Sequence, residues 1–265
     1  MVSEAALDVK GIDALARGAV PGSPTGGPGC AVGVAVDGEL CFAQGYGLAN
    51  LEQDAPITAE TVFDIGSTSK QFTAAAVLML ATDGLLGLDD PIRRHLTTLP
   101  ESPFGPITVR HLLHHTSGIP DYLGLVVQSG HGLENDYPED QIVDLIARQE
   151  GLLFAPGTRF SYTSSGYFLL AEVVRAASGR SLREVCDHRI FKPLGMTRTF
   201  CHDDFTEVVR GRASAYGPTR DGAGYRIDYR RSMCWGMAPS SPPSATWPVG
   251  ASSFSVARCR RGPTS

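Results

Sequence analysis

A serine and a lysine three residues apart stand at the start of a long apolar run, and this feature constrains the fold more than any other. The segment from Ser67 to Lys70 reads Ser-Thr-Ser-Lys and is followed by the apolar stretch from Phe72 to Ala81. This stretch is apolar on nearly every side, so it predicts a buried helix. The chain must build a core around this helix, with Ser67 and Lys70 at its N-terminal end.

This placement suits an enzyme that transfers acyl groups through a serine. Residues at i and i+3 share a helix face, so the Lys70 amine is expected to lie beside the Ser67 oxygen. A serine hydroxyl is a weak nucleophile and needs a base within hydrogen-bond reach. The helix N-terminus adds partial positive charge where negative charge develops on an attacked carbonyl oxygen. We expect Gly66 to leave room for close approach to Ser67.

The same spacing also occurs by chance, and the alternative is a solvated helix start or a satisfied core residue. A buried lysine is unusual and often functional. The chain holds only three lysines, Lys10, Lys70 and Lys192, so one of them at the start of a buried helix stands out.

Composition limits the classes of function. The chain has 265 residues, of which 42% are hydrophobic and 19% charged, as in ordinary soluble globular proteins of one or two domains. The net charge of -5 and the lack of a basic run argue against nucleic acid as a partner. No apolar stretch is long enough to span a bilayer, so we expect no membrane partner. The N-terminus shows no secretory signal pattern, which predicts a cytoplasmic location.

The cysteines and histidines predict neither a metal nor a cofactor. The six cysteines show no metal-ligand spacing, and we interpret them as reduced structural thiols. Adjacent side chains such as those of His114 and His115 are expected to point apart rather than onto one metal. We therefore interpret His114, His115 and Ser117 as structural residues.

The hydrophobic pattern predicts a hairpin followed by a series of helices. We expect a short helix over Lys10 to Arg17, strands over Cys30 to Val36 and Glu39 to Tyr46, and a tight turn at Asp37-Gly38. The helix after Ser67 should end at Asp83-Gly84. Further expected elements are a short helix after Asp89-Asp90-Pro91, helices from Thr108, over Asp140 to Gln149 and over Tyr167 to Ala177, a capping box at Ser181 to Glu184, and an irregular loop over Tyr122 to Pro138.

Several segments agree with one family. The Ser-x-x-Lys motif at Ser67 is joined, in order, by Ile107 to Gly118, Pro156 to Tyr167 and Phe191 to Met196. With these segments the chain resembles the serine beta-lactamase and penicillin-binding protein superfamily, particularly its class C-like branch. The resemblance implies an α/β (α+β) fold of the beta-lactamase/transpeptidase type, with an antiparallel sheet flanked by helices and a mostly helical domain.

The resemblance also implies roles for four residues. Ser67 would be the acylated nucleophile and Lys70 its proton partner. Tyr162 would hydrogen-bond the Ser67 oxygen and shuttle protons, although a tyrosine taken alone suits a core position with a satisfied hydroxyl. Ser164 stands where the family usually has asparagine, so it would bind substrate with one hydroxyl instead of an amide. No metal or cofactor is implied.

The predicted function is that of a serine hydrolase that acts through an acyl-enzyme on the ester, amide or lactam carbonyl of a small molecule, with an esterase-like preference. A beta-lactamase or D-alanyl-D-alanine carboxypeptidase is one alternative, and a non-catalytic acyl-binding or sensor protein is another. The sequence leaves the acyl group, the leaving group and the oligomeric state open.

The C-terminal region departs from the family pattern. We find no Lys/His-x-Gly motif on an edge strand, and we interpret Arg260-Arg261-Gly262 as a chance likeness. Composition changes after Cys234, where a proline- and serine-rich run begins. The coding DNA can also be considered in the reading frame that starts one base earlier. In that frame the Met237-Ala238 junction must encode glycine. The neighbouring codons are compatible with Asp-Gly-x-Ile-Leu-Thr-Thr followed by Asp-Leu-Ala-Arg-Trp, which resembles the sequence that the family has in this region.

We therefore predict a change of reading frame near Met233 to Gly236, with a genuine proline- and serine-rich disordered tail as the alternative. The expected parts are residues 1–64 with the first helix and the hairpin, 65–232 with the helical region and both motifs, and 233–265 as an out-of-frame or disordered tail. Without the C-terminal sheet strands the hairpin is marginal, so we expect poor solubility and weak or no turnover from the chain as written.

Overall fold

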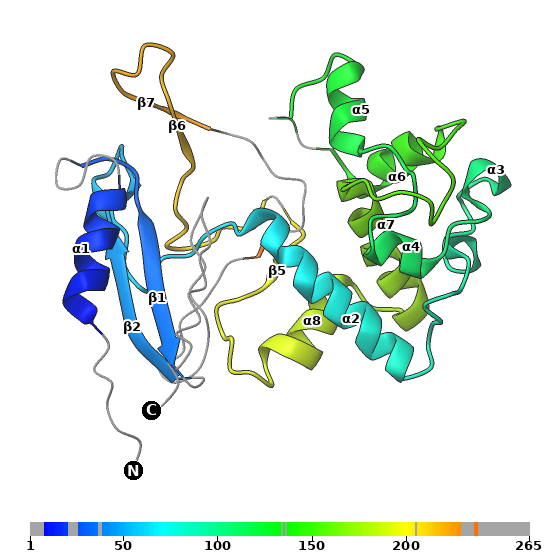
Figure 1. Cartoon of the computed structure of the whole chain (residues 1–265), viewed down its shortest axis with the longest axis horizontal. Coiled ribbons are helices and arrows are strands. Elements are labelled where there is room, and N and C mark those ends of the chain that lie inside the picture. The colour runs from blue at the N-terminus through cyan, green and yellow to red at the C-terminus, as the bar shows by residue number, and fades with distance from the viewer. Residues whose placement is uncertain are drawn as a thin grey trace, which may run out of the picture.

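The computed structural model describes residues 8–20, 26–36, 39–133, 135, 137–204, 206–228 and 236–237. A β-hairpin with one helix lies at one end of the molecule and helices α3 to α7 at the other, with α2 and α8 between them (Figure 1). The helices are α1 (Val9–Ala19), α2 (Lys70–Thr82), α3 (Glu101–Phe104), α4 (Val109–Leu113), α5 (Tyr122–Gln128), α6 (Glu139–Ala147), α7 (Ser164–Ser178) and α8 (Leu182–Cys186), with the short helical turns η1 (Gly66–Ser69), η2 (Ile92–Arg94) and η3 (Asp187–Phe191).

The strands pair two by two within the described residues. The pairs are β1 (Cys30–Val36) with β2 (Glu39–Tyr46), β3 (Leu48–Asn50) with β4 (Ala55–Pro56), β5 (Cys201–His202) with β8 (Gly236–Met237), and β6 (Tyr216–Pro218) with β7 (Tyr225–Ile227). All four pairs are antiparallel. The predicted class of antiparallel strands combined with helices is confirmed, and so is the small extent of the sheet.

The β1–β2 hairpin has the bounds that the sequence predicts, with a register shift between Val34 and Ala35. Its turn at residues 37–38 lies outside the described residues. Helix α1 covers one face, where the Tyr46 hydroxyl donates a hydrogen bond of 3.0 Å to Asp13. Burial, together with this carboxylate, raises the pKa of Tyr46 to about 12. No third strand among the described residues joins the hairpin, so α1 supplies its main covering.

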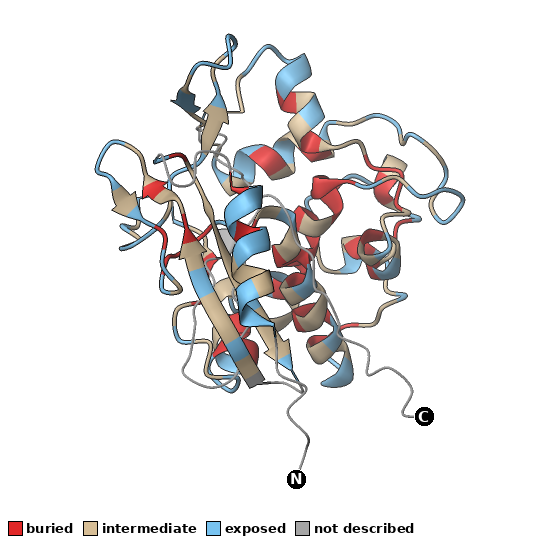
Figure 2. Ribbon diagram, turned by 60° about the vertical axis from the view of Figure 1, so that its left-hand side comes forward, coloured by how far each residue is buried: buried red, intermediate tan, exposed pale blue. Residues whose placement is uncertain are grey.

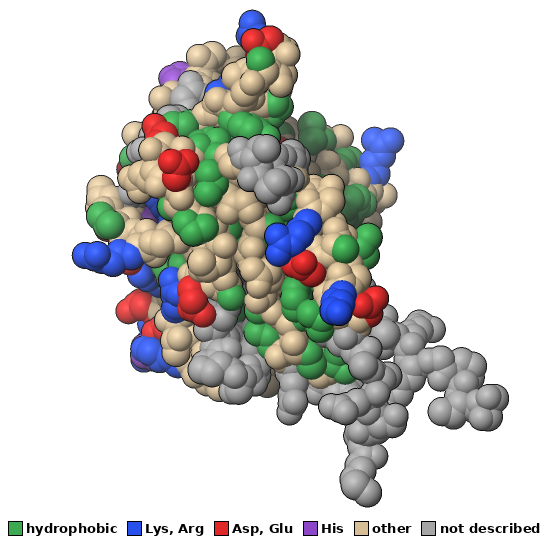
Figure 3. All heavy atoms as spheres, turned by 90° about the vertical axis from the view of Figure 1, so that its left-hand side faces the viewer, with side chains coloured by type: hydrophobic (Ala, Val, Ile, Leu, Met, Phe, Trp, Pro, Cys, Tyr) green, Lys and Arg blue, Asp and Glu red, His purple; other side chains and the backbone are tan. Residues whose placement is uncertain are grey.

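Charged side chains of both signs are interspersed on the face that carries α1 and the hairpin (Figure 3). One example is the ion pair on α1 between Arg17 and Asp13, whose atoms are 2.8 Å apart. Both side chains are partly open to water, and such pairs contribute little to stability. This face therefore presents mixed charge rather than a basic stripe.

The main core lies in the helical part, where α7 packs against α2, α4, α5 and α8. Buried residues gather in these helices, whereas the hairpin strands are mostly of intermediate exposure (Figure 2). The core side chains include Ala76, Val77, Leu80, Leu112, Leu169, Leu170, Val173, Val174, Leu182 and Phe191. This packing fixes the N-terminal ends of α2 and α7 relative to each other, and those ends carry the candidate site.

Helix α2 follows the prediction in its ends but not on all of its sides. It stops at Asp83, and Gly84 has a left-handed φ of 75°, as expected for a glycine after a helix. Leu78, however, is 49% exposed. The expectation that an apolar run is buried all round was therefore wrong for this side of the helix.

The segment from Tyr122 to Pro138, predicted as an irregular loop, begins with helix α5. Asp121 caps this helix by accepting a hydrogen bond from the Leu123 backbone at 2.9 Å. Tyr122 and Val126, one turn apart, are both buried on its inner side. The glycines between Tyr122 and Pro138 suggested a loop, but the cap and the i, i+4 apolar pair decide the local structure.

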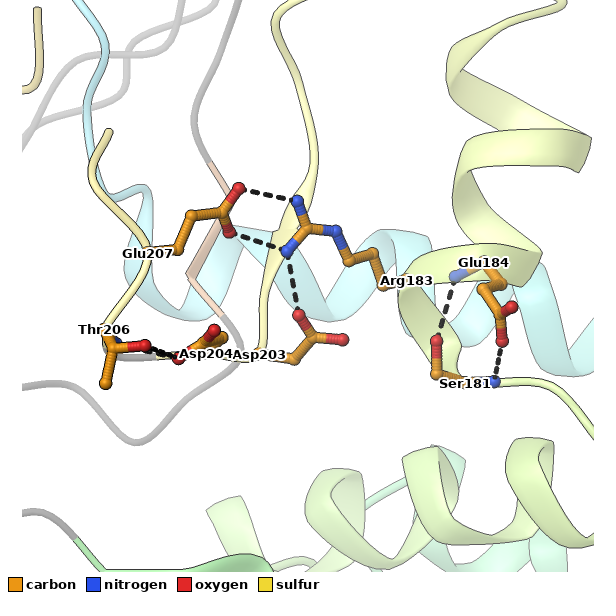
Figure 4. A network of polar contacts seen from close by, with 7 residues as sticks. All are labelled: Ser181, Arg183, Glu184, Asp203, Asp204, Thr206 and Glu207. Carbon is orange, nitrogen blue, oxygen red and sulfur yellow. Dashed lines mark hydrogen bonds and ion pairs between the residues drawn. The ribbon is translucent and has the colours of Figure 1, made fainter. Parts of the chain in front are cut away.

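Helix α8 begins at the capping box that the sequence predicts. The Ser181 hydroxyl accepts from the Glu184 backbone at 3.2 Å, and the Glu184 carboxylate accepts from the Ser181 backbone at 2.8 Å (Figure 4). The two bonds satisfy donors that a helix N-terminus leaves open. The cap therefore sets the orientation of α8 and of Arg183, which lies within the capping box.

Arg183 ties α8 to the segment that follows β5. Its guanidinium donates to Asp203 at 2.9 Å and to both oxygens of Glu207 at 2.7 and 2.9 Å (Figure 4). The guanidinium also lies 5.0 Å from the centre of the Phe200 ring. The hydrogen bond from Arg183 lowers the pKa of Glu207. Because the three charged side chains are partly buried, this group should stabilise the fold more than an open surface pair does.

Replacing Arg183 by alanine is expected to lower the free energy of unfolding by about 1–2 kcal/mol at pH 7. The pKa of Glu207 in the folded protein lies below its ordinary value. The contribution of the Arg183–Glu207 pair to the free energy of unfolding is therefore complete above the ordinary pKa, and it is lost as the pH falls through the folded pKa. Urea unfolding at pH 7 and pH 3 measures both effects. Arg189→Ala is the control, because Arg189 pairs with Asp83 near solvent and its loss should change the free energy of unfolding little. Equal losses for the two variants would contradict this account.

Candidate active site

Ser67 and Lys70 lie together as the sequence predicts. Ser67 is exposed and belongs to the turn η1, while Lys70 is the first residue of α2 and only 8% exposed. The Lys70 Nζ donates a hydrogen bond to the Ser67 Oγ at 3.2 Å. A tight turn with three residues per revolution places i and i+3 above each other, which brings these two side chains into line. The result is a solvent-facing hydroxyl beside a buried amine.

The turn before Ser67 depends on the conformation of Gly66. Gly66 has a left-handed φ of 51°, and its backbone N–H donates to the Asp64 carboxylate at 2.8 Å. A Cβ at Gly66 would meet no atom within 4 Å. The glycine is therefore needed for its backbone angle, and the expectation that it leaves room for approach to Ser67 stays a prediction.

Tyr162 reaches the site through its ring. The Lys70 Nζ lies 5.2 Å from the centre of the Tyr162 ring and 5.7 Å from that of Tyr167. Cations at such distances are attracted to the face of an aromatic ring. Tyr162 is 48% exposed, so it is not the core tyrosine of the alternative interpretation. The hydrogen bond from Tyr162 to Ser67 that the resemblance implies stays a prediction.

Ser164 is buried at the first position of α7, two residues after Tyr162. Its backbone N–H donates to the Asp121 carboxylate at 2.6 Å. The neighbouring Ser165 hydroxyl donates to the Pro120 carbonyl at 2.6 Å. These bonds fasten the start of α7 to the start of α5. The substrate contact expected of the Ser164 hydroxyl stays a prediction.

His115 lies against both tyrosines and was interpreted from sequence as a structural residue. Its ring centre is 4.5 Å from that of Tyr162 and 5.0 Å from that of Tyr167. Burial, followed by the nearby Lys70 charge, lowers the pKa of His115. The His-Thr-Ser-Gly run from 115 to 118 can be recognised in the sequence, but only the contacts in the folded structure show that this histidine borders the site.

The carboxylates, thiols and imidazoles of the described segments form no cluster of three or more that suits a metal ion. The helices described in the structure include none long and apolar enough to cross a bilayer. Strand β8 pairs with β5 and contacts the turn η1, so residues 236–237 lie near Ser67. The tail beyond residue 237, which carries most of the predicted change of reading frame, lies outside the described residues.

Comparison with known proteins agrees with this geometry. The family model described as Beta-lactamase matches residues 19–239. The chain belongs to the beta-lactamase family. Penicillin-binding protein 4* of Bacillus subtilis is 34% identical over 186 residues, which are 69% of this chain and 40% of that protein. A D-aminopeptidase of Gluconobacter oxydans is 32% identical over 196 residues, 74% of this chain and 37% of the relative.

The family is also evident in solved structures. The octameric penicillin-binding protein homologue from Pyrococcus abyssi superposes with a TM-score of 0.74 and 30% identity, covering 88% of this chain and 54% of that one. The predicted membership of the serine beta-lactamase and penicillin-binding protein superfamily is thus confirmed. This family member spans well under half the length of the curated relatives it matches, 40% and 37%. The predicted division at residues 64 and 232 stays a prediction.

Proposed function

We propose that this beta-lactamase family member is a serine hydrolase that forms an acyl-enzyme on Ser67 from a small ester or amide. The observation that carries the proposal is the 3.2 Å hydrogen bond between the buried Lys70 amine and the exposed Ser67 hydroxyl. An exposed hydroxyl is accessible to substrate, and the buried amine beside it is largely shielded from water. The similarity to a D-aminopeptidase supports amides among the substrates.

The proposed reaction has two stages. The Ser67 oxygen attacks the substrate carbonyl while its proton passes to the Lys70 and Tyr162 pair, and the C–O or C–N bond breaks as the leaving group takes up that proton. Water then attacks the acyl-serine ester, the acid leaves, and Ser67 regains its proton. The N-terminal end of α2 places partial positive charge near the developing oxyanion. Ser164 would contact the substrate carbonyl beside it.

Covalent labelling tests the first stage directly. A fluorophosphonate probe is expected to add once to the protein, and peptide mass spectrometry should locate the adduct on Ser67. Ser67→Ala should abolish the adduct, while Thr68→Ala, a change in the same turn, should retain it. An adduct on another residue, or equal labelling of Ser67→Ala, would refute the proposal.

The second stage separates a hydrolase from a protein that binds acyl groups without turnover. A chromogenic p-nitrophenyl ester should release its phenol continuously from a hydrolase. An acyl-binding protein would give a single stoichiometric burst and a stable mass adduct. Continuous release that disappears in Ser67→Ala supports the hydrolase, and a burst without further release supports the alternative.

A further inference from the structure

His115 holds the backbone on both sides of Tyr162. Its carbonyl oxygen accepts a hydrogen bond from the Ser161 N–H at 2.9 Å. Its ring Nδ1 accepts from the Thr163 N–H at 3.3 Å. Its ring packs against the Tyr162 ring itself, with centres 4.5 Å apart. One residue thus contacts three consecutive positions, 161, 162 and 163, so a change at His115 would alter where Tyr162 lies.

A second tyrosine also packs against the imidazole. The Tyr167 ring stacks on His115 with centres 5.0 Å apart and an angle of 30° between the planes. Tyr167 in turn donates its hydroxyl to the Leu113 carbonyl at 3.1 Å, which anchors it to the end of α4. The Phe160 ring stands at 79° to the same imidazole, with centres 5.9 Å apart. The imidazole therefore contacts three aromatic rings, which restrict its orientation.

The backbone of His115 indicates that this arrangement is specific. Its φ of 56° lies in the left-handed region, which a residue with a Cβ adopts only where its surroundings determine it. Such conformations are concentrated at functional sites. The contacts at 161, 163 and 167 are those surroundings.

The Thr163 bond also sets the chemical form of the ring. A ring nitrogen that accepts a hydrogen bond carries no proton, so the imidazole is neutral with its proton on Nε2. The titratable groups around the ring are Lys70 on α2, Tyr162 before α7 and Tyr167 on α7. Protonation of Nδ1 would break the bond to Thr163 and place a second cation near Lys70.

We propose that His115 is a positioning residue that acts as a neutral clamp, holding Tyr162 beside Lys70 for the acylation of Ser67. This inference rests on the proposed function, in which Tyr162 and Lys70 take up the Ser67 proton. The sequence of contacts runs from Thr163 through His115 and Tyr162 to Lys70, whose Nζ is 3.2 Å from the Ser67 Oγ. Small displacements of groups in such a sequence lower reaction rates strongly.

The protonation state of the His115 ring can be tested without measuring catalysis. In protein labelled with 15N-histidine, the ring nitrogen spectrum should show His115 with an unprotonated Nδ1 and a proton on Nε2 at pH 7. Because Lys70 is among the causes that lower the pKa of His115, Lys70→Met should raise that pKa. A proton on Nδ1 at pH 7, or a pKa of His115 that does not respond to Lys70→Met, would overturn the proposal.

The effect on acylation is tested by the rate of fluorophosphonate labelling between pH 5 and pH 9. His115→Phe keeps a ring beside the tyrosines but cannot accept from Thr163, and it should slow labelling at pH 8 by about 10- to 100-fold. In the unchanged protein, part of the fall in labelling at acid pH should follow the pKa of His115 read from the ring nitrogen spectrum, and this component should be absent in His115→Phe. His114→Phe is the matched control, because His114 is exposed, and it should label at the normal rate.

A second variant guards against simple loss of folding. His115→Asn tolerates the left-handed backbone and keeps an acceptor for Thr163, but it removes the ring that packs on Tyr162. It should also slow labelling, with a circular dichroism spectrum like that of the unchanged protein. Normal labelling rates in folded His115→Phe and His115→Asn would overturn the clamp. If the unchanged protein is never labelled, the proposed function fails. The ring nitrogen spectrum then remains as the test of whether the His115 ring is neutral and accepts the hydrogen bond from Thr163.

Discussion

Lys70→Met is expected to slow the acylation of Ser67 by about 10²–10⁴-fold, the usual range for removing a positioned acid–base group. The Nζ of Lys70 is hydrogen-bonded to the Ser67 Oγ at 3.2 Å, so this change removes the amine nearest to the nucleophile. Methionine retains an unbranched stem of similar length. The buried site therefore keeps its packing while the hydroxyl loses its partner.

Stability separates this chemical effect from damage to the fold. Lys70 is 8% exposed, and its removal takes a buried polar group out of the core, so Lys70→Met should unfold at the same urea concentration as the unchanged protein or at a higher one. Lys192→Met is the control, because Lys192 lies near solvent in an ion pair with Asp187. Labelling of Lys70→Met at the rate of the Lys192→Met control would show that the amine is not the proton partner.

Local signals predicted the elements that depend on neighbours in sequence. The hairpin bounds Cys30–Val36 and Glu39–Tyr46 follow from the two runs on either side of Asp37-Gly38, and both agree with the structure. The end of α2 follows from Gly84, and the start of α8 from the Ser181 capping box. The two helix signals join residues only a few positions apart, so the sequence contains the whole signal.

Contacts between distant parts of the chain were not predictable in this way. His115 accepts from Thr163, 48 residues away, and Arg183 meets Glu207 across 24 residues. Such pairs form only after α7 and α8 have packed, and no spacing rule indicates them. This is why a histidine beside a second histidine was interpreted as structural, although its ring packs against two tyrosines of the site.

Of the four predicted site residues, the structure brings Ser67, Lys70 and Tyr162 into one group. The Ser-x-x-Lys spacing alone predicted the first pair, because a helical turn fixes the distance. The place of Tyr162 came from the family resemblance, since no local rule connects position 162 with position 67. Its ring packing on His115 and Lys70 depends on the tertiary fold.

Determination of the coding DNA from the Arg231 codon through the Val249 codon and beyond the present stop is expected to reveal a missing or extra base. The family match ends at residue 239, a few residues after the predicted change of frame at Met233 to Gly236. Residues 236–237 already pair with β5 and contact the turn that carries Ser67. A sequence that continues in the family frame would extend the chain from that point, next to the candidate site.

The protein read in the corrected frame should differ from the present chain in two measurable ways. Added strands would pair with the β1–β2 hairpin, which no third strand joins among the described residues, so size-exclusion chromatography should show less aggregate. The family resemblance implies that the strand with the Lys/His-x-Gly motif supplies one of the two backbone N–H groups that bind the oxyanion, so its presence should raise the rate of ester hydrolysis by about 10²–10³-fold. Ser67→Ala in the corrected chain is the control, and it should abolish this gain. Confirmation of the present frame by the DNA would instead make Ser67 and Lys70 remnants of an ancestral site, and ester hydrolysis should then be no faster than in Ser67→Ala.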